Sequence, residues 1–230
     1  QLSQKILPAL FHEMFGDPIA NPNDWPMKPL SELGKVVTGS TPPSKREGMF
    51  DGPIPFVTPA DLKETWVEHH RSVTEAGASQ SRTVREGSAL VCCIGATIGK
   101  MGKATQLSAF NQQINAVEWH DETFDSYGLE ALRQIKQLIV SSGSSTTLPI
   151  INKSTFQALK IPSPPKELRQ QFGERSEQIE EVTKHQTISS PTLETLFQTV
   201  LHRAFDGTLT AKWREAHASE LLQEMEHQSR

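Results

Sequence analysis

A long charged segment in the last third of the sequence carries apolar residues along only one stripe. From Pro164-Pro165 to Phe205, apolar side chains recur at three- and four-residue steps among Glu, Gln, Arg and Lys. This period predicts a helix. The prolines favour a helix start there, and Gly207 would end the helix. Ser190 and Pro191 have the chemistry of a helix start, so the helix either continues through them or breaks at 189–191. One stripe cannot enclose a core, so the helix must bury it against another helix or a partner.

Residues 3–15 show a second amphipathic pattern of this kind, which Gly16-Asp17-Pro18 ends. When residues 7–15 are laid over residues 197–205, the apolar stripe is kept. The match indicates either two copies of one helical element at the two ends of the chain or a chance likeness between amphipathic helix ends.

Between these helical pieces, Pro, Gly, Ser and Thr separate short apolar runs, as is typical of strands and turns. Apolar residues over 126–140 recur at helical spacing instead, which predicts a helix on the same body. We therefore expect an α+β fold, in which a mixed α/β domain with a β-sheet core precedes the long helix. The best strand candidates are Ile54–Thr58, Ser88–Ile94 and Gln113–Trp119.

Composition excludes several classes of protein. The 230 residues include 23 Lys and Arg against 27 Asp and Glu, and the net charge of −4 does not favour a freestanding basic nucleic-acid clamp. No apolar run is long enough to span a membrane, and the first residues given do not have the basic-then-apolar pattern of a signal segment. Cys92 and Cys93 are adjacent, which suits neither a disulfide nor a closed zinc site, so we expect a soluble protein in the reducing cytoplasm.

Because the chain starts at Gln1 within an amphipathic pattern, we interpret it as a fragment or a processed chain.

Charge is distributed unevenly along the sequence. Residues 28–103 carry a net charge of +2, whereas residues 166–230 carry −3. A DNA-facing surface would therefore lie mainly within 28–103. The alternative is that so small an excess over 76 residues has no meaning.

Two segments within 28–103 have the residue types of DNA-contacting loops. Thr38–Arg46 combines hydroxyls, a glycine and two cations, which suit phosphate and groove contacts, although a solvated loop would look similar. Gly95–Lys100 is not a nucleotide-binding P-loop, because only three residues separate its glycines and Met101 replaces the Ser or Thr that would hold magnesium. It is either a turn that offers N–H groups and Lys100 to phosphate or a plain turn between strands.

Other segments are weaker candidates. Ser141–Thr147 is an uncharged Ser/Gly/Thr loop that suits either DNA contacts or a linker. Asn111-Gln112-Gln113 has amides that could read adenine, but we favour a role in satisfying backbone groups. Asp61-Leu62-Lys63 lacks the further carboxylates of a two-metal nuclease and is interpreted as a strand-to-helix turn. Neither a methyltransferase signature nor a histidine pattern for metal binding is present, so an enzyme in its own right is disfavoured.

Taken in order, these segments resemble the specificity (S) subunits of type I restriction-modification systems. Two departures are Lys166–Gln171, which replaces a more usual Leu-x-Glu-Gln, and the proline at 191. The similarity covers about residues 7–213, and the segments that carry it are Phe11–Pro18, Asn21-Pro22 with Trp25, Thr38–Pro42, Ile54–Leu62, Gly95–Lys100, Asn111–Ile114, Ile151–Lys153, Ile161–Pro165 and Ala204–Leu209.

The resemblance implies a non-catalytic DNA-specificity subunit with two recognition domains, each reading half of a split target, held apart by two antiparallel helices. This chain resembles the C-terminal half. The implied parts are the end of the central conserved helix at 1–17, a target recognition domain at 18–165, the distal conserved helix at 166–209 and a tail at 210–230.

The resemblance also implies partners. Double-stranded DNA and modification subunits would bind this chain, a restriction subunit would join the full complex, and an isolated half could form a homodimer. The chain itself would hold no cofactor, since S-adenosylmethionine, ATP and magnesium belong to the partner subunits. A protein-binding scaffold without DNA specificity is the alternative.

We assign candidate residues on this basis. Candidate DNA contacts are Thr38, Gly39, Ser40, Thr41, Lys45, Arg46, Arg82, Arg85, Thr97, Lys100, Lys103, Ser144 and Thr146. Candidate partner contacts on the long helix are Leu168, Phe172, Ile179, Val182, Leu196, Val200 and Phe205.

Overall fold

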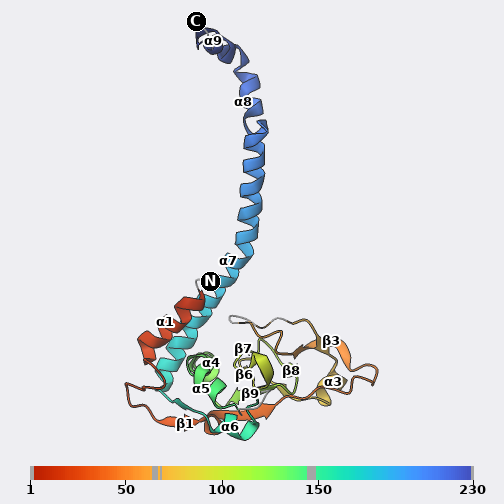
Figure 1. The fold of residues 1–230 in the computed structure, drawn as a ribbon, viewed down its shortest axis with the longest axis vertical. Helices are drawn as coiled ribbons and strands as arrows, with labels where there is room; N and C mark the ends of the chain where they lie inside the picture. Colours follow the sequence, from red (N-terminus) through yellow and green to blue (C-terminus); the bar gives the residue numbers. More distant parts are fainter. Residues whose placement is uncertain (1–2, 64–66, 68, 144–148, 229–230) are drawn as a thin grey trace. The chain divides into compact units, whose positions relative to one another are not determined.

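The computed structural model describes residues 3–63, 67, 69–143 and 149–228 (Figure 1). The chain divides into two compact units, residues 1–180 and residues 181–230. Unit 1 holds all the strands and the first turns of the long helix α7 (Lys166–Phe205). Its other helical elements are α1 (Ser3–Phe15), α2 (Leu30–Leu33), α3 (Glu75–Ser79), the 3-10 turn η1 (Gly95–Thr97), α4 (Phe124–Gln134), α5 (Lys136–Ser141) and α6 (Lys153–Ala158).

The central sheet of unit 1 has four antiparallel strands in the order β2-β9-β6-β7. Thr38 pairs with Asn115, and Cys92 pairs with Ile114, so the last residues of β2 and β6 lie beside the first residues of β9. The strands are β2 (Gly34–Thr38), β6 (Ala89–Cys92), β7 (Met101–Lys103) and β9 (Ile114–Trp119).

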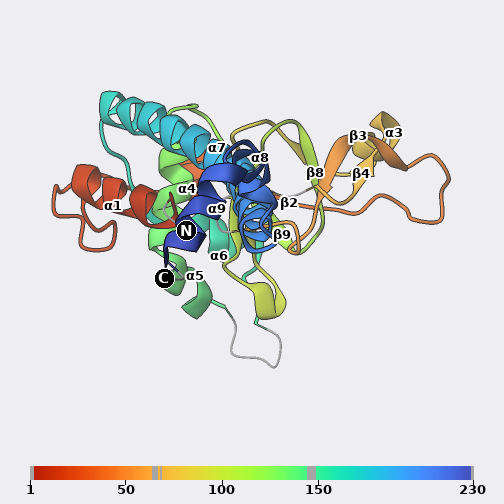
Figure 2. The same cartoon turned by 90° about the horizontal axis from the view of Figure 1, so that it is seen from above.

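A second four-stranded sheet has the order β4-β3-β8-β5, and its β3 and β8 are parallel. Both strands therefore terminate at the same end of the sheet. The second sheet lies on the side of unit 1 away from α1, as both views show (Figures 1 and 2). Its strands are β3 (Phe50–Val57), β4 (Ser72–Val73), β5 (Thr83–Val84) and β8 (Ser108–Phe110), and a separate antiparallel pair joins β1 (Met27–Pro29) to β10 (Lys160–Pro162).

An aromatic cluster joins α1, α4 and α7. The ring of Tyr127 lies 5.5 Å from that of Phe11 and 4.8 Å from that of Phe15, and the ring of Phe172 lies 5.4 Å from that of Phe15. All four side chains are buried, and the Tyr127 hydroxyl donates to the carbonyl of Pro162. Burying one such side chain stabilises a fold by about 1.5–3 kcal/mol, so this cluster fixes α1 and the start of α7 on the domain.

The expected α+β fold is confirmed, and each expected strand coincides with an observed one to within four residues. The helix expected over 126–140 is instead two helices. Ile135 leaves helical geometry at φ −91° and ψ 16°, yet its N–H still donates to Ala131, and Ile139 donates back to it. The bend keeps both Ile135 and Ile139 in the core.

The turn expected at Asp61-Leu62-Lys63 is present, but the strand-to-helix interpretation is wrong. The next regular element among the described residues is a strand, β4, which pairs with β3 at the edge of the second sheet.

Unit 2 is helical. Helix α7 is continuous through 189–191, so the start signal at Ser190 and Pro191 does not break it. The helix ends at Phe205, and Gly207 closes it in the left-handed conformation, with φ 76°. The expected tail contains the 3-10 turn η2 (Thr208–Thr210) and the helices α8 (Ala211–Ala216) and α9 (Ala218–Gln228). Within the described residues, no helix has both the length and the apolar character that a membrane crossing requires.

Candidate nucleic-acid interface

Several connections meet at one end of the two sheets, which we call the loop end: the base of the 39–48 loop at 39–41, and residues 58–61, 95–100 and 111–113. The sheet register brings the loops after β2 and β6 to the start of β9. Hydrogen bonds then link them, since Gly39 N–H donates to the Ile114 carbonyl at 3.0 Å and Cys93 N–H donates to the Gln113 carbonyl at 2.8 Å.

The 39–48 loop is fixed at its base. A Cβ atom on Gly39 would lie 2.1 Å from the carbonyl oxygen of Asn111, so only glycine fits there. The neighbouring Ser40 N–H donates to Phe110 at 3.0 Å, and the exposed Thr41 hydroxyl donates to the Gln112 side chain at 2.9 Å. Residues 39–41 and 111–113 therefore form one surface, although they are 70 or more residues apart in sequence.

The Thr38 side chain faces inward. Its hydroxyl donates to Asn115 at 2.7 Å, which favours a structural role over a DNA contact. Thr97 is also engaged, because its hydroxyl lies 3.3 Å from the sulfur of Cys92.

Cations with exposed side chains lie at or near the loop end. Lys45 and Arg46 are on the 39–48 loop, Lys100 closes the turn after β6, and Arg82 precedes β5. Their side chains make no ion pair or hydrogen bond to another described residue. These groups are available to a polyanion, and their contact with DNA stays a prediction.

Asp61 fixes the turn at 58–61. Its buried carboxylate accepts hydrogen bonds from the N–H and hydroxyl of Thr58 at 2.7 and 2.6 Å and contacts Nδ1 of His70 at 2.6 Å. Burial alone would raise the pKa of Asp61, but the Thr58 and His70 hydrogen bonds outweigh it and lower this pKa below its usual value. Asp61 thus holds the turn at 58–61 in place.

Arg85 and Lys103, two predicted DNA contacts, lie elsewhere. Lys103 ends β7 opposite Ala89, at the other end of the central sheet, and its ammonium lies 3.2 Å from the Glu180 carboxylate. Arg85 holds both oxygens of Asp125 at 2.8 Å and also donates to the Trp119 carbonyl. Both cations are neutralised internally, so the structure favours a structural role for each.

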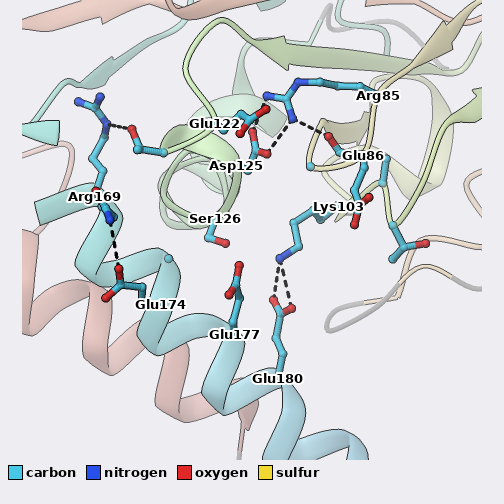
Figure 3. A pocket seen from close by; sticks show the side chains of 16 residues that line it. Arg85, Glu86, Lys103, Glu122, Asp125, Ser126, Arg169, Glu174, Glu177 and Glu180 are labelled. Atoms are coloured by element: carbon cyan, nitrogen blue, oxygen red, sulfur yellow. Dashed lines mark hydrogen bonds and ion pairs between the residues drawn. The ribbon is translucent and has the colours of Figure 1, made fainter. Parts of the chain in front are cut away.

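These two cations line a hollow of about 770 Å³ beside α7 (Figure 3). The charged groups around it are three cations, Arg85, Lys103 and Arg169, against six carboxylates, Glu86, Glu122, Asp125, Glu174, Glu177 and Glu180. Its net negative charge would repel DNA, which leaves the loop end as the favoured nucleic-acid surface.

The predicted partner contacts differ in their availability. Phe172 is 1% exposed, and Phe11 and Phe15 of α1 cover it, so it is a core residue and not a contact for another chain. Leu168 packs against the same core, and Ile179 lines a groove beside α1. The contacts predicted in unit 2 are all exposed in this chain: Val182, Leu196, Val200 and Phe205.

Ser144 and Thr146, also predicted DNA contacts, lie outside the described residues. In the part of the chain that the structure describes, no group of three His, Cys, Asp or Glu side chains is arranged to hold a metal ion.

The chain is similar to proteins of one family. Residues 22–190 match the model of the type I restriction modification DNA specificity domain. The chain is 29% identical over 198 residues to the type I restriction enzyme HindI specificity subunit of Haemophilus influenzae, covering 82% of this chain and 42% of that protein. It is 26% identical over 160 residues to the MjaIX specificity subunit of Methanocaldococcus jannaschii, covering 66% and 37%. The chain thus spans less than half the length of these relatives.

Solved structures share the fold. The crystal structure of the HsdS subunit from Thermoanaerobacter tengcongensis superposes with a TM-score of 0.57 at 21% identity, over 89% of this chain and 51% of that one. The type I restriction-modification S subunit from M. genitalium superposes with a TM-score of 0.59 at 15% identity, over 87% and 53%. Because this family model matches residues 22–190, which is more than half of the chain, the chain belongs to the type I restriction-modification DNA specificity family.

Proposed function

We propose that unit 1 reads one half of a split DNA target through its loop end. The observation that carries this proposal is that residues 39–41, 58–61, 95–100 and 111–113 meet at one end of the sheets, and that exposed cations on these connections make no ion pair with another described residue. Backbone hydrogen bonds hold the bases of these loops, so they can present side chains in fixed positions. Fixed side chains are what direct reading of base edges requires.

Within this surface, the two cations of the 39–48 loop would contact phosphate or guanine. Thr41 and Gln112 are already hydrogen-bonded to each other and exposed, so they would offer hydroxyl and amide groups to base edges. Lys100 would bind phosphate next to the N–H groups of its turn. Catalysis would belong to partner subunits that bind S-adenosylmethionine, ATP and magnesium.

The double variant Lys45→Ala/Arg46→Ala tests the loop assignment in the enzyme assembled with its modification subunits. Removing two phosphate contacts should lower the salt slope of DNA binding by about 2, because each contact contributes roughly 0.9. The matched control is Lys28→Ala/Lys160→Ala, which removes the same charge from the β1–β10 pair. Equal salt slopes for the two double variants would refute the assignment.

We further propose that unit 2 docks on protein. Its α7 segment exposes a continuous apolar stripe of Leu193, Leu196, Phe197, Val200, Leu201 and Phe205, all between 37% and 86% exposed. The occupant would be an antiparallel helix of the same type, either from the other half of a complete subunit or from a second copy, with modification subunits beside it.

Charged substitutions test this surface without touching the core. Leu196→Glu with Val200→Glu should abolish assembly while leaving unit 1 folded. Sedimentation and co-purification with modification subunits measure the loss, and Glu194→Gln with Gln198→Glu is a control on the same helix. Assembly unchanged by the apolar-to-glutamate variant would exclude the stripe as the docking surface.

A further inference from the structure

Arg71 was not among the residues singled out by sequence, yet it borders the loop end. It immediately precedes the edge strand β4, and its carbonyl accepts a hydrogen bond from Phe56 N–H at 2.9 Å. Phe56 is one residue before the end of β3, where the chain enters the turn at 58–61. At the other end of β4, Thr74 donates to the carbonyls of Gly48 and Met49. The segment that carries Arg71 is therefore attached to both neighbouring loops.

The Arg71 side chain is held over two aromatic rings. Its guanidinium carbon lies 5.1 Å from the centroid of Phe50 and 5.4 Å from that of Phe56, and the two rings meet edge to face at 6.1 Å. Such cation–π contacts restrict the rotamers of a long side chain and leave its N–H edge directed to solvent. Less conformational freedom then remains to be lost when a ligand binds.

Three other arginines of unit 1 serve the fold instead. Arg85, Arg133 and Arg169 each form an ion pair with a carboxylate of α4 or of the loop before it. Arg71 is exposed, and its guanidinium has no hydrogen bond or ion pair to another described residue. A guanidinium that is oriented in this way, with no carboxylate partner among the described residues, is suited to an external ligand that presents two acceptors side by side.

We propose that Arg71 contacts DNA directly, binding the paired acceptors of either a guanine edge or a phosphate. This inference rests on the proposed function of the loop end. Both sources offer two oxygen or nitrogen acceptors at the spacing of the guanidinium fork. Lysine carries the same charge without that fork, so it separates the two sources.

The test uses the assembled enzyme and a library of DNA duplexes randomised across the target window. Arg71→Met and Arg71→Lys are compared with wild type and with Lys160→Met, which removes an exposed cation from β10. Thermal unfolding checks that each variant is folded. We expect Arg71→Met to bind about tenfold more weakly than wild type, and Lys160→Met to bind like wild type.

The pattern of loss identifies the ligand. If Arg71 reads guanine, both Arg71 variants lose preference at one base pair of the target. If it binds phosphate, the base preferences stay the same, Arg71→Lys retains most of the affinity, and Arg71→Met reduces the salt slope by about 1. Arg71→Met with wild-type affinity and preferences would overturn the inference. Failure of the proposed function is distinct, because wild type itself would then select no sequence from the library.

Discussion

Replacing Arg169 with methionine is expected to destabilise unit 1 by about 2–4 kcal/mol. Arg169 is 6% exposed and lies at the start of α7. Its guanidinium donates to Asp121 at 2.8 Å, to the Thr123 hydroxyl at 3.0 Å and to the Pro164 carbonyl at 2.5 Å. The same group stacks on the ring of Phe124 at 4.0 Å. One side chain thus holds the first turn of the helix on the residues that begin α4.

The magnitude follows from what methionine keeps and loses. Methionine retains the apolar stem over Phe124 but removes every donor, and hydrogen bonds involving a charged group are each worth about 1.5–3 kcal/mol. The Asp121 side chain is 35% exposed, so water compensates part of its loss. The Pro164 carbonyl is less accessible and stays unsatisfied, which keeps the cost above the 1 kcal/mol of an average substitution.

The cost should also depend on pH. Burial raises the pKa of Asp121, but hydrogen bonds from Thr123 and the charge of Arg169 outweigh this and lower the pKa below its usual value. A lowered pKa stabilises the fold above the pKa of the unfolded chain, near 4, and this stability is lost as the pH falls through the folded value. The difference between wild type and Arg169→Met should therefore shrink in acid.

Urea unfolding followed by tryptophan fluorescence measures this difference, with Trp213 of unit 2 replaced by phenylalanine in every variant. Arg175→Met is the control, because it removes an exposed arginine from the same helix and should change stability by less than about 0.5 kcal/mol. If Arg169→Met and Arg175→Met unfold at the same urea concentration at pH 7, the hydrogen bonds of Arg169 contribute nothing and the reasoning fails.

Three further outcomes are expected. Burial raises the pKa of Cys93 to about 12, so iodoacetamide at pH 8 should label it in the unfolded chain but hardly in the native one, as fragment mass spectrometry would show. Gly128→Ala should lower the melting temperature, because its Cβ would lie 2.4 Å from the buried ring of Trp119, whereas Gly173→Ala has open space and should raise it. Asp61→Asn should remove part of the acid dependence of stability below about pH 4 in urea titrations, since the folded pKa of Asp61 is lowered.

Local patterns predicted the elements whose residues repeat regularly. The stripe from Leu168 to Phe205 predicted α7, and the alternating run from Gln113 to Trp119 predicted β9. Such a period is visible within a short stretch of sequence, so the element can be predicted without knowing what it packs against. The split at Ile135 was not predictable in this way, because the bend follows from where α4 and α5 meet the core.

The candidate site depended on topology, which no local pattern contains. Lys100 and Lys103 are three residues apart in sequence, yet β7 carries Lys103 toward the opposite end of the sheet, where Glu180 neutralises it. Arg85 and Arg71 are both arginines beside short strands, and only the fold shows that one holds a carboxylate and the other two aromatic rings. Residue type alone could not separate them.

The separation of charge within unit 1 gives the net value of −4 a physical interpretation. Where α4 meets α7, carboxylates form ion pairs with all three cations, Arg85, Lys103 and Arg169, and the remaining Glu side chains make that face negative. At the loop end, the cations have no described internal partner. A polyanion approaching unit 1 would therefore be attracted to one end and repelled from the other, and this polarity would orient the domain on DNA before any base is read. Because screening acts over about 8–10 Å at physiological salt, such orientation would act only at close approach and would weaken as salt is raised.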